Sequence, residues 1–311
     1  MKFHITIFSK EGGRMLSRYI TLGSFVFLIL LVLAGCSGHK TDSPVSDKEL
    51  SSQENDFRKF KTQDGEIEIN IFNNGSFSEA TIKQIKEETL SFYNALQKEN
   101  APMSSPSIIY LHLYDDKKVS YTNGNTIHLY WVKEGNYPLI HELTHVFFGS
   151  TEGHATLEGL AIFMQDFYSD RRVFPNYQGD VHDIMKYLMT QEISIPLETL
   201  LSKDKIFTHS NLNKDSYSLR WLGYIESASF SNYLINQYGI GEFLKIYDRP
   251  NLTDEIDKIY GKKVEQLEME WKEFVQKNLT SNEETIRSYD PQIQEIISHL
   301  EANKERILKT S

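Results

Sequence analysis

The spacing of hydrophobic residues changes once along this chain, near residue 138, and this change constrains the fold more than any other feature. Before it, Ile67, Ile69 and Ile71 alternate with polar residues, which predicts a strand. After it, hydrophobic residues recur three or four positions apart, which predicts helices. We therefore expect an α+β fold, with a small mixed β-sheet first and a mostly helical subdomain after it.

Turn and helix signals divide the two parts into elements. In the first part we predict strands at 66–72, 107–114, 119–121 and 126–131 and a helix at 79–98. The dipeptide Asn123-Gly124 predicts a hairpin between the last two strands, because both residues accept positive φ. In the second part we predict helices near 155–168, 181–190, 222–238, 241–247, 253–260, 264–278 and 291–308.

The composition of the 311 residues excludes several classes of protein. A hydrophobic share of 40% is enough for a packed core, so the body of the chain is not intrinsically disordered. A single cysteine excludes a disulfide-stabilised scaffold. The net charge of −10 argues against nucleic acid as a partner, because contacts with phosphates require clustered Lys and Arg.

The first 36 residues have the pattern of a secretion signal. Basic residues precede a hydrophobic run over 19–34, which ends in Leu33-Ala34-Gly35-Cys36. This tetrapeptide resembles the lipobox of bacterial lipoproteins. The resemblance implies that Cys36 is lipidated, begins the mature chain and anchors it to the outer side of the cell membrane. An uncleaved anchor helix is the alternative interpretation.

Two further observations agree with a lipid anchor. The one cysteine of the chain cannot form an internal disulfide, whereas lipidation accounts for its presence. Residues 36–57 are polar and lack hydrophobic periodicity, so we predict a flexible tether between the membrane and the folded body.

Residues 141–145 read His-Glu-Leu-Thr-His and carry the strongest chemical signal in the chain. On a helix, residues four apart differ by about 40° in direction and about 6 Å in height, so His141 and His145 can bind one metal ion. Glu142 lies at the edge of the same cleft, where its carboxylate can reach a metal-bound water. The alternative is two surface or core histidines beside a helix-capping carboxylate.

A catalytic zinc site needs a third protein ligand and one open position for water. Glu158 is the first candidate, because it lies in a largely hydrophobic predicted helix where an unpaired carboxylate is unfavourable. His154 and Glu152 are alternative third ligands, in or near the predicted turn between the two helices. We therefore expect one Zn²⁺ per chain, held in a cleft between the sheet part and the helical part.

The two predicted helices together resemble the gluzincin metallopeptidases, a superfamily that includes thermolysin and the aminopeptidases. The resemblance lies in His141-Glu142-x-x-His145 and in Leu-Glu-Gly-Leu-Ala at 157–161. It implies that His141, His145 and Glu158 are zinc ligands and that Glu142 is the general base. It also implies that the substrate is a peptide or protein.

Two features depart from the family pattern. Only 12 residues separate His145 from Glu158, fewer than is usual among gluzincins. Ile162 stands where thermolysin-like members place an Asp that orients a ligand histidine. Asp166, one turn further on, is a candidate for that role, and an ordinary solvated Asp is the alternative.

The resemblance also points to a tyrosine that stabilises the developing oxyanion. Tyr224, followed four residues later by Ala and then by hydrophobic residues, resembles that segment of the family. The alternative is a residue of an amphipathic helix whose hydroxyl is merely hydrogen-bonded. Tyr217 and His209 are weaker candidates, and His182 is predicted to be structural or exposed.

The strand predicted at Thr126 to Trp131 is expected to form an antiparallel edge of the sheet. Family members place such a strand above the metal, where an extended substrate adds as a further strand. An edge strand without any partner is the alternative.

Together these observations predict a membrane-anchored zinc metallopeptidase that hydrolyses peptide bonds through a zinc-activated water, with Glu142 as general base. The alternative is a surface lipoprotein with a binding or structural role and an inactive or purely structural metal site. The predicted organisation is a signal peptide at 1–35, the lipidated Cys36 and tether at 36–57, a metallopeptidase-like domain at 58–280 (sheet part 58–148, helical part 149–280) and a C-terminal helical tail at 281–311.

Overall fold

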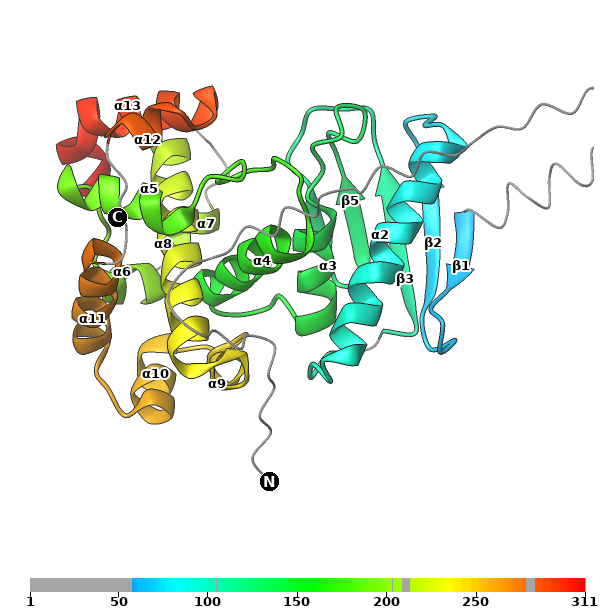
Figure 1. Ribbon diagram of the computed structural model, residues 1–311, viewed down its shortest axis with the longest axis horizontal. Helices are drawn as coiled ribbons and strands as arrows, with labels where there is room; N and C mark the ends of the chain where they lie inside the picture. The colour runs from blue at the N-terminus through cyan, green and yellow to red at the C-terminus, as the bar shows by residue number, and fades with distance from the viewer. Residues whose placement is uncertain (1–57, 105, 203, 209–212, 278–282, 311) are drawn as a thin grey trace, which may run out of the picture.

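Figure 1 shows the computed structural model of the chain, which describes residues 58–104, 106–202, 204–208, 213–277 and 283–310. The predicted signal peptide, Cys36 and the tether lie outside the described residues. Within those ranges no helix is long and hydrophobic enough to cross a membrane. The architecture is α+β, as predicted, with the sheet on one side of the molecule and most of the helices on the other (Figure 1).

In the described part of the chain, the sheet has five strands in the order β1-β2-β3-β5-β4. The inner pairs β2–β3 and β3–β5 are parallel, whereas β1 and β4 pair antiparallel with their neighbours. The predicted mixed sheet with an antiparallel edge is therefore confirmed. The strands are β1 (Lys59–Lys61), β2 (Glu68–Asn73), β3 (Ile108–Leu113), β4 (Tyr121–Asn123) and β5 (Thr126–Leu129).

One face of the sheet is packed against helices. The alternation of side chains places Ile69, Leu111 and Ile127 on this face, where each is fully buried. Two helices, α2 (Glu79–Lys98) and α3 (Leu139–Phe148), contribute buried side chains to the same hydrophobic core. The helix that carries the predicted metal-binding motif is thus fixed against the sheet.

The prediction that Thr126 to Trp131 forms the sheet edge is wrong. β5 lies between β3 and β4, and its Ile127 pairs with Leu111 of β3. The predicted hairpin does form, with β4 as its other arm, so the short β4 becomes the edge. β5 ends at Leu129, and Trp131 has φ of 61°, which is outside the range of a strand.

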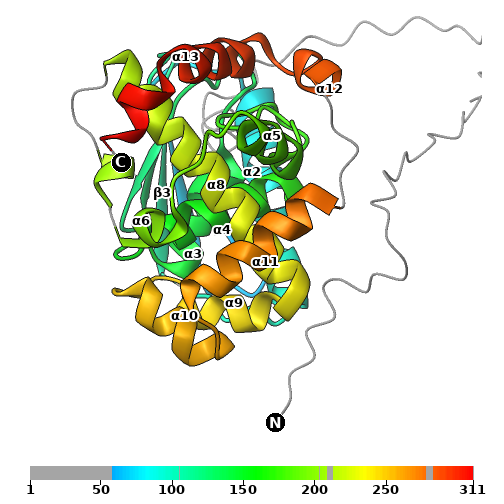
Figure 2. The same ribbon diagram turned by 90° about the vertical axis from the view of Figure 1, so that its left-hand side faces the viewer.

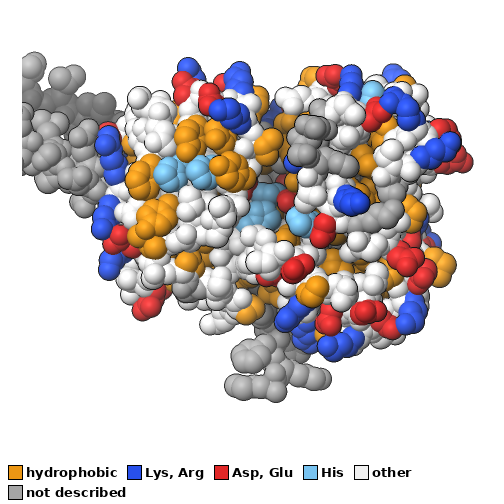
Figure 3. Space-filling view, turned by 180° about the vertical axis from the view of Figure 1, so that it is seen from behind, with side chains coloured by type: hydrophobic (Ala, Val, Ile, Leu, Met, Phe, Trp, Pro, Cys, Tyr) orange, Lys and Arg blue, Asp and Glu red, His pale blue; other side chains and the backbone are white. Residues whose placement is uncertain are grey.

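The other face of the sheet carries a row of stacked rings. The ring centroids of Phe72 and His112 are 4.4 Å apart, those of His112 and His128 5.1 Å, and those of His128 and Tyr121 4.5 Å. Phe72 and Tyr121, at the two ends, are 43% and 48% exposed. In the view from behind, histidine side chains lie among hydrophobic ones over this half of the molecule (Figure 3).

The second part of the chain is helical, and its long helices lie close to their predicted positions. The shorter α6, α7 and α12 were not predicted, because one or two turns are too few to show a periodicity. The helices are α4 (His154–Tyr168), α5 (Val181–Thr190), α6 (Leu197–Ser202), α7 (Lys205–Thr208), α8 (Lys214–Tyr238), α9 (Ile240–Ile246), α10 (Leu252–Tyr260), α11 (Val264–Lys277), α12 (Glu283–Arg287) and α13 (Pro291–Leu308).

Helix α8 is the central element of the helical part. It packs against α4, α5, α9 and α13, and Figure 2 shows it running through the middle of this half. It begins eight residues before the predicted start, because Asn213 caps a polar first turn by accepting a hydrogen bond from the Ser216 amide at 2.9 Å. The predicted C-terminal tail packs on it through α13, which buries Ile293 and Leu300.

Candidate metal centre

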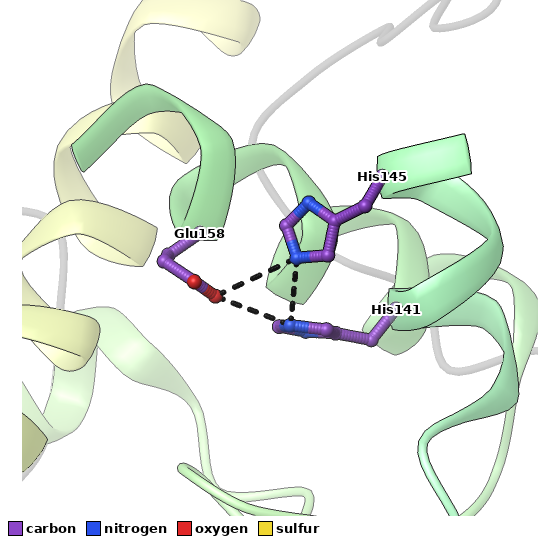
Figure 4. Close-up of side chains that lie close together, drawn as sticks. All are labelled: His141, His145 and Glu158. Atoms are coloured by element: carbon purple, nitrogen blue, oxygen red, sulfur yellow. Dashed lines mark hydrogen bonds and ion pairs between the residues drawn. The ribbon is translucent and has the colours of Figure 1, made fainter. Parts of the chain in front are cut away.

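Helix α3 positions both histidines of the predicted motif. It begins just after Pro138 and ends before Gly149, which has φ of 96°, as predicted from the glycine. His141 and His145 lie one turn apart on it and point the same way, toward α4 (Figure 4). Gln165 of α4 accepts a hydrogen bond at 3.1 Å from the His141 amide, one of the first-turn amides that lack a partner within the helix.

Three ligand atoms from two helices converge between α3 and α4. The Nε2 atoms of His141 and His145 are 3.2 Å apart. Oε2 of Glu158, from α4, lies 3.1 Å from Nε2 of His141 and 3.8 Å from Nε2 of His145 (Figure 4). The structure therefore brings together the three residues that were predicted as ligands.

These separations fit a tetrahedral zinc site. Ligand atoms about 2.1 Å from a tetrahedral ion lie about 3.4 Å from one another, close to the three distances observed. Two imidazole nitrogens and a carboxylate oxygen are also the ligand types that zinc prefers. The side chains are 9% to 14% exposed, so the donor set is largely buried, and His141 also lines the neighbouring pocket.

The surroundings of the centre favour the charged forms of Glu158 and His141 and the neutral form of His145. Burial disfavours the charged form of His141, but the hydrogen bond to Glu158 and its charge outweigh burial and raise the pKa of His141. Burial lowers the pKa of His145 to about 4, so its imidazole is neutral at pH 7. Burial alone would raise the pKa of Glu158. The hydrogen bond to His141 and the charges of the two histidines outweigh burial, so the pKa of Glu158 is lowered and the carboxylate is favoured.

The short connection between the two ligand helices is held in place by the loop after α9. Oδ1 of Asp248 accepts hydrogen bonds from the amides of Thr151 and Glu152 at 2.8 and 2.9 Å. The Tyr247 hydroxyl donates to the carbonyl of Gly149 at 2.8 Å. These contacts fix a tight turn, which explains how only 12 residues between His145 and Glu158 suffice.

The two alternative third ligands lie outside the cluster. His154 is the first residue of α4, and its Nδ1 is 3.1 Å from Oδ1 of Asp204. The side chain of Glu152 is exposed. Among the described residues, the group that can hold a metal ion consists of His141, His145 and Glu158.

Glu142 has the burial and the position that a proton acceptor needs. It is 4% exposed, and its Oε2 accepts a hydrogen bond at 2.8 Å from the hydroxyl of Thr122 on β4. Burial raises the pKa of Glu142 to about 7, against the opposing effects of His141 and Thr122. Thr122 was not predicted, because its sequence neighbours give no sign that β4 reaches the motif.

A pocket of about 280 Å³ opens beside Glu142 and His141, and Tyr224 is among the residues that line it. Burial raises the pKa of Tyr224, which keeps its hydroxyl protonated and able to donate. Tyr217 also lines the pocket, whereas His209 lies outside the described residues.

The remaining predicted candidates have other contacts. Oδ2 of Asp166 accepts a hydrogen bond from Asn176 at 2.8 Å, and within the described ranges no hydrogen bond joins Asp166 to either ligand histidine. Nδ1 of His182 lies 2.9 Å from the Ser229 hydroxyl in the core, which agrees with a structural role.

Gly159, next to the third ligand, allows α4 and α8 to approach closely. A Cβ added there would lie 2.0 Å from Oγ of Ser231 and 2.7 Å from the carbonyl oxygen of Ser227, both on α8. We expect Gly159→Ala to destabilise the metal-free protein by about 1–3 kcal/mol through overpacking, as measured by urea unfolding. Gly241→Ala in α9, where nothing lies within 4 Å of the added Cβ, is the control and should be neutral or stabilising. Equal stability of the two variants would contradict the prediction.

Comparisons with known proteins do not assign the chain to a family. A scan against protein-family models and a search of curated proteins both found no match.

Proposed function

We propose that this protein is a zinc-dependent metallopeptidase of the gluzincin type. The observation that carries the proposal is the convergence of His141, His145 and Glu158 on one point, with the carboxylate of Glu142 at the adjoining pocket. Three protein ligands leave one position for water, which is the pattern of catalytic rather than structural zinc sites.

Each of the neighbouring side chains has a role in peptide-bond hydrolysis. Zinc held by the three ligands would supply a Lewis acid that polarises the scissile carbonyl and lowers the pKa of a water to about 7. Glu142 takes a proton from the attacking water as the C–O bond forms. It then passes the proton to the nitrogen of the leaving amine as the C–N bond breaks.

Two further groups support this assignment of roles. The Thr122 hydroxyl holds the Glu142 carboxylate at a fixed position, so the acceptor oxygen does not have to be oriented during the reaction. Tyr224, with its protonated hydroxyl at the pocket, is the proposed donor to the oxyanion that develops on the scissile carbonyl.

We also propose that the protein works at the outer side of the cell membrane, anchored by a lipid on Cys36. The support is the sequence before residue 37, with its basic residues, hydrophobic run and lipobox-like tetrapeptide. Its substrates would then be peptides or proteins outside the cytoplasm.

Metal analysis joined to a cleavage assay tests the proposed function. We expect the purified protein to contain about one zinc ion per chain and to cleave an unstructured protein such as denatured casein. A chelator should abolish cleavage, and added zinc should restore it. Cleavage that survives removal of the metal would contradict a zinc-dependent mechanism, whereas a site that binds zinc without any hydrolysis would favour the binding or structural alternative.

A further inference from the structure

The pocket beside Glu142 is lined by more basic than acidic side chains, although the chain as a whole has a net charge of −10. Among the described residues that line the pocket, only Glu142 is acidic. The basic lining residues are Lys117, Lys118, Arg172 and Arg220. Such a pocket favours an anionic group on the substrate at any of these cations that is not already paired with a carboxylate.

Three of these basic residues are already paired with a carboxylate, at distances of 2.8 to 3.2 Å. These pairs are Lys117 with Glu134, Lys118 with Asp116 and Arg172 with Asp290. No carboxylate of the described residues lies within ion-pair distance of Arg220. Because Arg220 is also half-buried, its charge is less screened by water than the charges at the rim.

Arg220 lies close to the groups that act on the substrate. It is one turn before Tyr224 on α8, and both residues line the pocket together with His141 and Glu142. The Arg220 guanidinium is near enough to the Tyr224 hydroxyl to oppose the rise in the pKa of that tyrosine. A substrate group that binds Arg220 would therefore be only a residue or so from the scissile bond.

We propose that Arg220 binds a carboxylate carried by a substrate residue next to the scissile bond. A guanidinium offers two parallel N–H donors that match the two oxygens of a carboxylate, and such pairs are strong in partly desolvated sites. Rings of Trp131, Phe174 and Tyr177 form further walls of the pocket and suit a hydrophobic neighbour of that carboxylate. The inference rests on the proposed peptidase function and makes it a peptidase for peptides that are negatively charged beside the cut.

The carboxylate can come from a C-terminus or from an Asp or Glu side chain, and three short peptides distinguish these sources. The probes are acetyl-Ala-Ala-Phe, its C-terminal amide, and acetyl-Ala-Ala-Asp amide. We expect the full zinc-loaded chain, purified in mild detergent, to cleave at least one carboxylate peptide about 10–100-fold more efficiently than the Phe amide, mainly through KM. Preference for the first peptide alone identifies a C-terminal carboxylate, and preference for the third identifies an acidic side chain.

Two substitutions then assign the preference to Arg220. In Arg220→Gln the preference should disappear, whereas Arg220→Lys should restore part of it because the charge is kept. Arg172→Gln, which removes a basic residue of the same pocket that is already paired, should keep the preference. A preference that survives in Arg220→Gln, or that is lost equally in Arg172→Gln, would overturn the inference. Zinc content and thermal unfolding of each variant show whether the site and the fold are intact.

A binding measurement separates this inference from the proposed function. Calorimetric titration of the same peptides into the Glu142→Gln variant, with and without Arg220→Gln, reports carboxylate binding without any turnover. Selective binding that depends on Arg220, with no hydrolysis by the unmodified chain, would keep Arg220 as a carboxylate-binding residue and overturn the peptidase. Hydrolysis of all three peptides at equal rates would support the peptidase and overturn the proposed role of Arg220.

Discussion

Replacing Glu142 with Gln is expected to lower the rate of peptide hydrolysis by about 10²–10⁴-fold, the usual contribution of a general base. The substitution keeps the size of the side chain and its contact with Thr122, but the amide cannot take up a proton from water. Because Glu142 is not a metal ligand, zinc should stay bound at about one ion per chain. Single-turnover cleavage and metal content, measured on the same sample, check both parts of the expectation.

Glu152→Gln provides the matched control for this experiment. Glu152 is an exposed carboxylate in the turn between the two ligand helices, and it lies outside the metal-binding group. Its replacement should leave the rate unchanged within about twofold, because surface substitutions away from a site have small effects. A Glu142→Gln variant with normal turnover would refute the assignment of Glu142 as the base.

Replacing Glu158 with Gln is expected to weaken zinc binding by about 100-fold or more, beyond the 10–100-fold typical of residues that only support a ligand. A neutral amide is a poorer ligand for zinc than the carboxylate that lies 3.1 Å from His141. Hydrolysis should fall in parallel with zinc occupancy. Competition titration with a chromophoric chelator measures the affinity, and circular dichroism shows whether the variant is folded.

His154→Gln tests the alternative third ligand under the same conditions. Since His154 contacts Asp204 and lies outside the cluster, its replacement should leave zinc affinity unchanged. A loss of affinity in His154→Gln, with none in Glu158→Gln, would mean that the metal is held by a different set of residues.

Most of the elements that build the site could be predicted from the sequence, because their signals are local. The limits of α4 and α13 follow from hydrophobic periodicity and from nearby turn residues, and α3 ends at a glycine as expected. Because residues four apart lie on the same face of any α-helix, the spacing of His141 and His145 is enough to predict that their side chains converge. Glu158 could be proposed because a carboxylate in a hydrophobic helix requires a partner.

The features that were missed depend on contacts between residues far apart in the chain. Thr122 reaches Glu142 only because β4, and not β5, takes the edge of the sheet. Periodicity describes the two faces of a strand but carries no information on which strand lies beside it. Asp248 fixes the turn between the ligand helices from almost 100 residues away, and a lone Asp in a loop gives no sequence signal.

The arrangement of the ligands has a consequence for the integrity of the whole molecule. His141 and His145 belong to the helix that is seated on the sheet, whereas Glu158 belongs to the helix packed on α8. An ion bound by all three acts as a cross-link between the two halves of the chain. At a free-metal concentration 100 times the dissociation constant, such a cross-link adds about 2.7 kcal/mol to the free energy of unfolding. Binding of a metal at this site would therefore raise the temperature of thermal unfolding as the free-metal concentration rises, even where no substrate is present.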